Sequence, residues 1–243
     1  MSQDKLDNLL EPLILETQIL DPSKSNEAKK VSLNSKFGGS PYAEEHDSWP
    51  QRPTCKNDLV FIAQLKDDKT GNLFVFYYCF ECFPWGLGDE EKGQWIIRRY
   101  QNSSMEKYQE IFPYQKNETL VVPCTVSMKT VKALPDWEGL ESHFNEAGDL
   151  CSEIDDDNPW EEYESAVIRN SCLNDYATLL GGYPRWVQGE TTNKCPECDE
   201  ELKFLGQIDS EDAAGIMWGD VGLVYLFQCK NHPDIFHMEL QRH

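Results

Sequence analysis

The stretch Cys195-Pro-Glu-Cys198 is followed by two apolar runs, 202–208 and 223–227, and then by Cys229-Lys-Asn-His232. A two-residue spacer lets one tight turn aim both side chains of a pair at a single ion. Two apolar strands between the pairs would bring the second pair beside the first. The pattern predicts a zinc-ribbon-like element in which Cys195, Cys198, Cys229 and His232 bind zinc.

This ligand set indicates the role of the metal. Three thiolates and one imidazole form a closed tetrahedral shell with no position for water, which is typical of structural zinc. His237 is an alternative fourth ligand. We favour His232, because its spacing from Cys229 matches the spacing of the first pair.

A related pattern occurs earlier in the chain at a constant offset. Gly38-Gly39-Ser-Pro41 resembles Gly181-Gly182-Tyr-Pro184, and positions 38 and 181 differ by 143. After a seven-residue insertion in the later copy, Cys79-Phe-Glu-Cys82 aligns with Cys229-Lys-Asn-His232, and positions 79 and 229 differ by 150. A repeated pattern of this length predicts an internal duplication.

The earlier copy offers a second, weaker metal site formed by Cys55, Cys79 and Cys82. At the offset of 143, Cys55 aligns with Cys198, but Arg52 aligns with Cys195. Either His46 supplies a fourth ligand or this copy has lost its metal. Three ligands with an open position are also the arrangement of catalytic zinc.

Two further positions have alternative interpretations. Gln64 and Gln207 occupy equivalent places in the two copies. They either bond across a pseudo-twofold axis, which we expect, or line a cleft between the copies. Trp218-Gly-Asp220 lies in the insertion of the later copy, where a turn is the simplest interpretation and a ligand contact the alternative.

The fold class predicted from these patterns is α+β: internally duplicated antiparallel sheets with a pseudo-twofold relation and few short helices. We expect an N-terminal leader of helix and strand (1–34), a first copy (35–134), an acidic helical linker (135–176) and a second copy (177–243), packed as one globular unit. In the linker, Asp136 suits a helix N-cap, and Asn158-Pro159 suits a helix start with Trp160, Tyr163 and Val167 facing the core. Strands are expected at 13–20, 59–65, 73–78, 95–100, 120–126, 202–208, 223–227 and 236–240.

Composition and charge restrict the partners. The 243 residues carry a net charge of −21, which repels nucleic acids and anionic lipid and attracts basic proteins. No apolar run approaches the roughly 18 residues that span a bilayer, and no signal peptide is recognisable. Nine cysteines, an odd number, favour metal or free thiols over disulfides. We therefore expect a cytoplasmic protein.

The chain resembles the YwqG-like family through the motifs Ser35-Lys-Phe-Gly-Gly-Ser-Pro-Tyr42, Phe61-Ile-Ala-Gln64, Phe204-Leu-Gly-Gln-Ile-Asp209 and Met217-Trp-Gly-Asp-Val-Gly222. The resemblance implies a duplicated α+β architecture with antiparallel sheets, and some members sit in toxin–immunity gene neighbourhoods. More distantly, the chain is similar to the programmed-cell-death-protein-two group. That similarity implies a chaperone or adaptor that holds a basic ribosomal protein.

We predict a non-enzymatic zinc-binding module whose acidic surface binds a basic protein, as a chaperone, adaptor or immunity protein. Residues 135–164 hold twelve acids and no lysine or arginine, and we expect the contact there. The alternative is an enzyme of unknown reaction, with a cleft between the copies and possibly the three-cysteine site of the first copy. The chain contains no nucleophile elbow, P-loop, dinucleotide fingerprint or HExxH motif.

Overall fold

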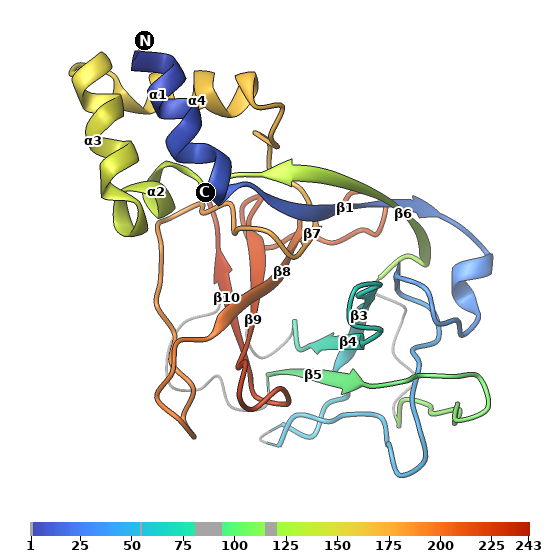
Figure 1. The fold of residues 1–243 in the computed structure, drawn as a ribbon. Coiled ribbons are helices and arrows are strands. Elements are labelled where there is room, and N and C mark those ends of the chain that lie inside the picture. Colours follow the sequence, from blue (N-terminus) through green and yellow to red (C-terminus); the bar gives the residue numbers. More distant parts are fainter. Residues whose placement is uncertain (1, 54, 81–93, 115–120) are drawn as a thin grey trace.

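Ten strands form one antiparallel sheet in the order β10-β9-β8-β7-β1-β6-β2-β3-β4-β5 (Figure 1). The computed structural model describes residues 2–53, 55–80, 94–114 and 121–243. The strands are β1 (Leu15–Lys24), β2 (Lys36–Phe37), β3 (Val60–Lys66), β4 (Leu73–Tyr78), β5 (Trp95–Tyr100), β6 (Cys124–Ala133), β7 (Leu179–Leu180), β8 (Lys203–Asp209), β9 (Leu223–Gln228) and β10 (Phe236–Gln241). The α+β class and the antiparallel pairing are as predicted.

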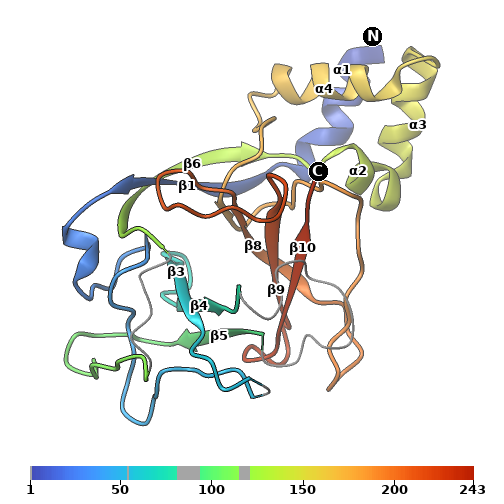
Figure 2. The same ribbon diagram turned by 180° about the vertical axis from the view of Figure 1, so that it is seen from behind.

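The two long strands lie at the centre of the sheet. β1 and β6 pair over ten residues, from Leu15 with Ala133 to Lys24 with Cys124. The short strand β7 joins the other edge of β1, and the short strand β2 joins the other edge of β6. Each short strand leads into a three-stranded meander, β8-β9-β10 or β3-β4-β5, and both meanders lie on the same side of the β1–β6 pair (Figures 1 and 2).

The two meanders have the same register. Lys36 pairs with Gln64, and Leu179 pairs with Gln207, at an offset of 143 on both strands. A bulge interrupts the first pairing of each meander, between Phe61 and Ala63 in one and between Phe204 and Gly206 in the other. The outer strands β5 and β10 then add in the same antiparallel sense.

The buried side chains of Gln64 and Gln207 each bond to a loop next to their own meander. The expectation that they bond to the other copy across a pseudo-twofold axis is therefore wrong. Gln64 Oε1 accepts from the amide of Tyr42 at 3.1 Å, and its Nε2 donates to the carbonyl of Asn34 at 2.7 Å. Gln207 makes the equivalent bonds, to the amide of Arg185 and the carbonyl of Ala177, both at 2.9 Å. Each amide satisfies backbone groups of the loop around its Gly-Gly turn, which buried backbone requires.

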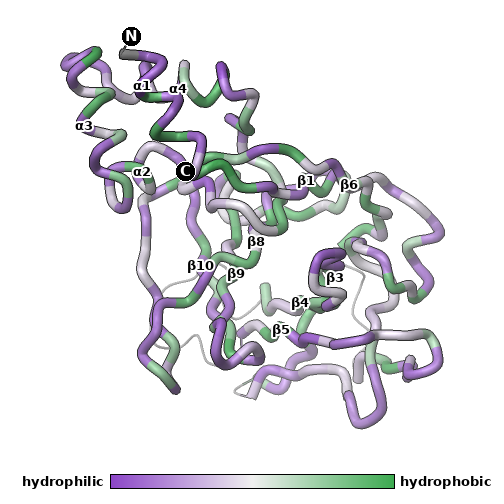
Figure 3. The backbone as a smooth tube through the Cα atoms, in the orientation of Figure 1, coloured by the Kyte–Doolittle hydropathy of each residue, from purple (hydrophilic) through white to green (hydrophobic). Residues whose placement is uncertain are grey.

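The main core lies between the meanders. The inner faces of both contribute apolar side chains, and β4 is buried along its whole length because Leu-Phe-Val-Phe-Tyr-Tyr offers apolar or aromatic groups to both sides. In Figure 3 the strands of the meanders carry hydrophobic segments, and the connecting loops are mainly hydrophilic. Phe74 of β4 and Phe236 of β10 are in edge contact, with ring centroids 6.1 Å apart, so the last strand at one end of the sheet contacts the second-last strand at the other.

The loop 210–222, which contains the seven-residue insertion, joins the half of the sheet with β8-β9-β10 to the half with β3-β4-β5. The expected turn is present: the Gly222 amide donates to the carbonyl of Trp218 at 2.8 Å. The Trp218 ring is buried, lying edge-on to Tyr78 at 5.2 Å and stacked on Phe80 at 5.5 Å. The loop of the second half is therefore anchored in aromatic residues of the first.

Glu211, in the same loop, is a half-buried acid among other acids. Burial raises the pKa of its carboxyl to about 7; the Thr178 hydroxyl donates to it and opposes the rise, whereas Asp209, Asp21 and Asp212 add to it. Cys124 of β6 also faces this group. The folded state therefore keeps a proton here that the unfolded chain releases near 4.5.

Glu211→Gln should remove one pH-dependent loss of stability. Because the pKa is raised on folding, the contribution of Glu211 is fully present below about pH 4.5 and falls as pH rises toward 7. Urea unfolding at pH 5 and pH 8 measures the free energy of unfolding. Between these two pH values it should fall less for the variant than for the wild type. The control is Glu153→Gln, at an exposed position of the linker. Equal losses for wild type and Glu211→Gln would show that the proton is not held.

Four helices form a bundle at one end of the β1–β6 pair (Figure 1). They are α1 (Ser2–Leu10), α2 (Trp137–His143), α3 (Asn145–Ile154) and α4 (Pro159–Arg169), with 3-10 turns at Glu11–Leu13 and Glu27–Lys29. They share a small core that includes Leu6, Leu140 and Leu150. No helix in the described ranges is long and apolar enough to cross a membrane.

The helix signals of the linker were largely correct. The Asp136 side chain caps α2 by accepting from the Gly139 amide at 2.9 Å, and α4 begins at Pro159. Tyr163 and Val167 are buried as expected, but Trp160 is 47% exposed, so its expected place in the core is wrong. β6 begins at Cys124 and runs seven residues beyond the predicted end at 126, because β1 supplies backbone partners along a mostly polar strand.

Candidate metal centre

Two tight turns at one end of the β8–β9 hairpin carry the candidate ligands. In the first turn the Asp199 amide donates to the Cys195 carbonyl at 2.9 Å, and Asp199 adopts a positive φ of 58°. In the second, Cys229 follows β9 directly, and the Ile235 amide donates to the His232 carbonyl at 2.8 Å. Because β8 and β9 are antiparallel neighbours, the two turns lie side by side.

The structure brings Cys195, Cys198, Cys229 and His232 together, with all four ligand atoms within 4.8 Å of one another. Cys195 Sγ lies 3.6 Å from His232 Nδ1, and Cys229 Sγ lies 3.8 Å from the same nitrogen. Cys198 Sγ and Cys229 Sγ are 3.7 Å apart, far beyond a disulfide bond of about 2.05 Å.

These separations match the edges of a tetrahedron around zinc. With Zn–S near 2.3 Å and Zn–N near 2.0–2.1 Å, the edges are about 3.8 Å for S···S and about 3.5–3.6 Å for S···N. The site can therefore hold a zinc-like ion. His237, the alternative ligand, lies outside the group; it is on β10, with its ring 6.3 Å from that of Phe227.

Hydrogen-bond donors around the sulfurs favour thiolates. Burial raises the pKa of Cys195, but the backbone amides of Glu197 and Cys198 and the side chains of Cys229 and His232 outweigh it and lower the pKa to about 7. The His232 amide donates to Cys229 Sγ at 3.3 Å. Thiolate is the form that binds metal, so the amides around Cys195 favour its metal-binding form, whereas the neighbouring thiols of Cys195 and Cys229 help to raise the pKa of Cys198.

The first half keeps the shape of the Cys195 turn. The Lys56 amide donates to the Arg52 carbonyl at 3.0 Å, and Lys56 has a positive φ of 60°, as Asp199 does. Arg52 and Cys79 are buried and Cys55 is half-buried. Cys82 lies outside the described residues, so the site formed by Cys55, Cys79 and Cys82 stays a prediction.

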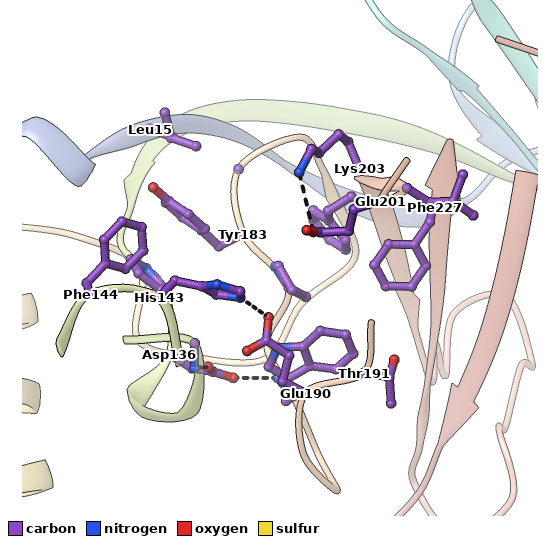
Figure 4. Close-up of a pocket in the computed structure, with 17 residues that line it drawn as sticks. Leu15, Asp136, His143, Phe144, Tyr183, Glu190, Thr191, Glu201, Lys203 and Phe227 are labelled. Atoms are coloured by element: carbon purple, nitrogen blue, oxygen red, sulfur yellow. Dashed lines mark hydrogen bonds and ion pairs between the residues drawn. The ribbon is translucent and has the colours of Figure 1, made fainter. Parts of the chain in front are cut away.

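A cavity of about 500 Å³ lies between α2 and the β8–β9 hairpin (Figure 4). His143 Nε2 lies 2.6 Å from Glu190 Oε1, and the Trp186 amide donates to Asp136 Oδ2 at 2.7 Å. Burial raises the pKa of Asp136, and the hydrogen bonds from the backbone amides of Gly139 and Trp186 oppose the rise. The sequence did not indicate this cavity, since its lining comes from Leu15, from residues 135–144, 182–191 and 201–204, and from Phe227. The Gly-Gly-Tyr-Pro motif that borders it was the one local signal.

Comparison with curated proteins finds no match. Residues 35–231, well over half of the chain, match a family described as a domain of unknown function (DUF1963). The match begins just before β2 and ends just before His232, so it covers the meander β3-β4-β5, the strands β8 and β9 of the other meander, and three of the four candidate ligands. The chain is therefore a member of the DUF1963 family.

Proposed function

We propose that this protein is a zinc-binding protein-interaction module of the YwqG-like type, without catalytic activity. Cys195, Cys198, Cys229 and His232 would hold zinc in a closed shell, and the ion would fix the β8–β9 hairpin. Cys79, Cys124, Cys151, Cys172, Cys195, Cys198 and Cys229 are free thiols within the described residues, which suits a reducing compartment such as the cytoplasm.

The acidic surface of the helical bundle carries the interaction proposal. Nine of the twelve linker acids are exposed: Glu138, Glu141, Glu146, Asp149, Glu153, Asp156, Asp157, Glu161 and Glu164. Arg169, the cation at the end of α4, is engaged by Asp7 and Glu162. The exposed carboxylates would attract a basic protein, such as a nascent ribosomal protein or a cationic toxin.

We also infer that the chain is a duplicated five-strand unit whose long strands are exchanged, with β1–β5 as one copy and β6–β10 as the other. Gln18 pairs with Leu180, and Cys124 pairs with Phe37; the long-strand positions differ by 106 and their partners by 143. The central pair Asp21 and Ser127 also differs by 106, so the β1–β6 ladder maps onto itself. The registers of β1 with β7, of β6 with β2, and of β1 with β6 therefore all obey the same relation between the copies. This supports a duplication with pseudo-twofold symmetry.

Capture from native lysate tests the interaction. At about 0.1 M salt the tagged protein should retain basic proteins, and about 1 M salt should release them, because the screening length falls from about 10 Å to 3 Å. Zinc measured on the same sample should approach one ion per chain. The control is a variant with Gln or Asn at Glu153, Asp156, Asp157 and Glu161, which should retain less. Capture that is insensitive to salt contradicts the proposal.

A further inference from the structure

The first half of the protein holds an arginine side chain in a pocket of its own. Arg98 of β5 places its Cζ 5.6 Å from the centre of the Tyr77 ring. Its Nη1 lies 3.6 Å from Asp47 Oδ1, and its Nη2 donates to the carbonyl of Ser48 at 2.7 Å. An aromatic ring, a carboxylate and a carbonyl therefore bind one guanidinium group, a combination that suits arginine.

The second half has the same receiving positions. At the offset of 143, Asp47 corresponds to Glu190, and Ser48 to Thr191. At the offset of 150 along β4 and β9, Tyr77 corresponds to Phe227. The carboxylate and the aromatic ring are therefore retained, and the backbone carbonyl of Thr191 stands at the position of the Ser48 carbonyl that binds Arg98.

The arginine itself is replaced by an acid. Arg98 pairs with Val75 in the first half, and Glu239 pairs with Tyr225, the counterpart of Val75, in the second. Glu239 is held by the Thr191 hydroxyl and by Gln241 Nε2. The second half therefore has the residues that receive a guanidinium and supplies none at the equivalent position.

The 500 Å³ cavity lies where the guanidinium would bind. Glu190, Thr191, Trp186 and Phe227 line it, with the ring planes of Trp186 and Phe227 stacked at 18° (Figure 4). Glu190 Oε1 is bonded to His143, whereas Glu190 Oε2 is buried and has no hydrogen-bond partner within the described part of the chain. A buried carboxylate oxygen without a donor is unfavourable, so a ligand that supplies an N–H would be stabilised here once the carboxylate turns this oxygen toward the cavity.

We propose that this pocket binds the guanidinium group of an arginine side chain from a protein partner. Glu190 Oε2 accepts from the guanidinium, and the indole of Trp186 beside Phe227 provides the aromatic wall. The cavity exceeds one side chain, so residues next to the arginine also enter it. This rests on the proposed function, since it names the residue by which a basic partner is recognised.

Titration with a small ligand tests the pocket without the partner. The probes are N-acetyl-arginine methylamide and the citrulline analogue, which has the same shape without the charge. NMR shifts of residues around Glu190 should saturate with the arginine probe at concentrations where the citrulline probe causes little change. Glu190→Gln, which keeps an oxygen for His143, should weaken arginine binding about tenfold or more. Glu106→Gln removes the same charge from an exposed site outside the acidic surface and should leave the affinity within about twofold.

A second variant installs the missing arginine. Glu239→Arg should place a guanidinium against Glu190, as Arg98 lies against Asp47, and abolish binding of the added probe while the folded spectrum persists. Equal binding of arginine and citrulline probes, or equal weakening by Glu190→Gln and Glu106→Gln, overturns the proposal. Salt-sensitive capture of basic proteins without arginine binding would refute the pocket alone. Arginine binding with salt-insensitive capture would refute the acidic-surface function alone.

Discussion

Cys229→Ser should yield a protein that binds no zinc and unfolds at much lower urea concentration than the wild type. Cys229 lies directly after β9 and is close to both Cys198 and His232. Its replacement leaves only three of the four ligands for the ion. A hydroxyl is a poor zinc ligand, and loss of a structural metal is among the few causes of very large destabilisation. We expect the free energy of unfolding to fall by more than about 3 kcal/mol.

Metal content by mass spectrometry and urea unfolding with and without a chelator check this result. The chelator should destabilise the wild type and leave Cys229→Ser unchanged. Cys172→Ser is the matched control, because it removes a half-buried thiol outside the ligand group and should keep one zinc per chain. A wild type whose unfolding curve does not respond to chelator would contradict a structural role for the ion.

Trp218→Ala should destabilise the whole molecule by about 3–5 kcal/mol, the range for deleting a fully buried aromatic side chain. Trp218 is 1% exposed and fits against Tyr78 and Phe80 of the other half. Its removal leaves a cavity between the halves and also frees the 210–222 loop. The unfolding transition should move to lower urea as a single step, because the halves share this core.

Trp160→Ala provides the comparison. Trp160 is 47% exposed on α4, and its truncation should cost less than about 1 kcal/mol. Tryptophan fluorescence reports the environment of both residues, so circular dichroism is the better probe of unfolding. If the two truncations cost the same, Trp218 does not join the halves.

The features of this fold that are determined by residues close together in the chain could be predicted from the sequence. The spacing of Cys195 and Cys198 determines a turn by itself, and the cap at Asp136 needs three residues of context. The matched Gly-Gly-x-Pro motifs pointed to equivalent registers. Each of these signals depends on neighbours along the chain.

The features that sequence reasoning missed depend on distant partners. The polar end of β6 is a strand because β1 lies beside it, and nothing in residues 127–132 indicates that pairing. Helix signals were recognised at Asp136 and at Asn158-Pro159 but not for α3 between them; Ala147 and Leu150 of α3 become core residues because α1 and α4 cover them. The cavity beside Glu190 appears when α2 is placed against the β8–β9 hairpin.

The position of β1 at the centre of the sheet has a consequence for synthesis. Its two neighbours, β6 and β7, follow it in the chain by more than 100 residues. At about 5–20 residues per second, the ribosome leaves this strand without either neighbour for at least about 5–20 s. A growing chain with so late a partner exposes backbone that can pair with other nascent polypeptides, so production of this protein should respond strongly to translation speed and to the supply of holdase chaperones.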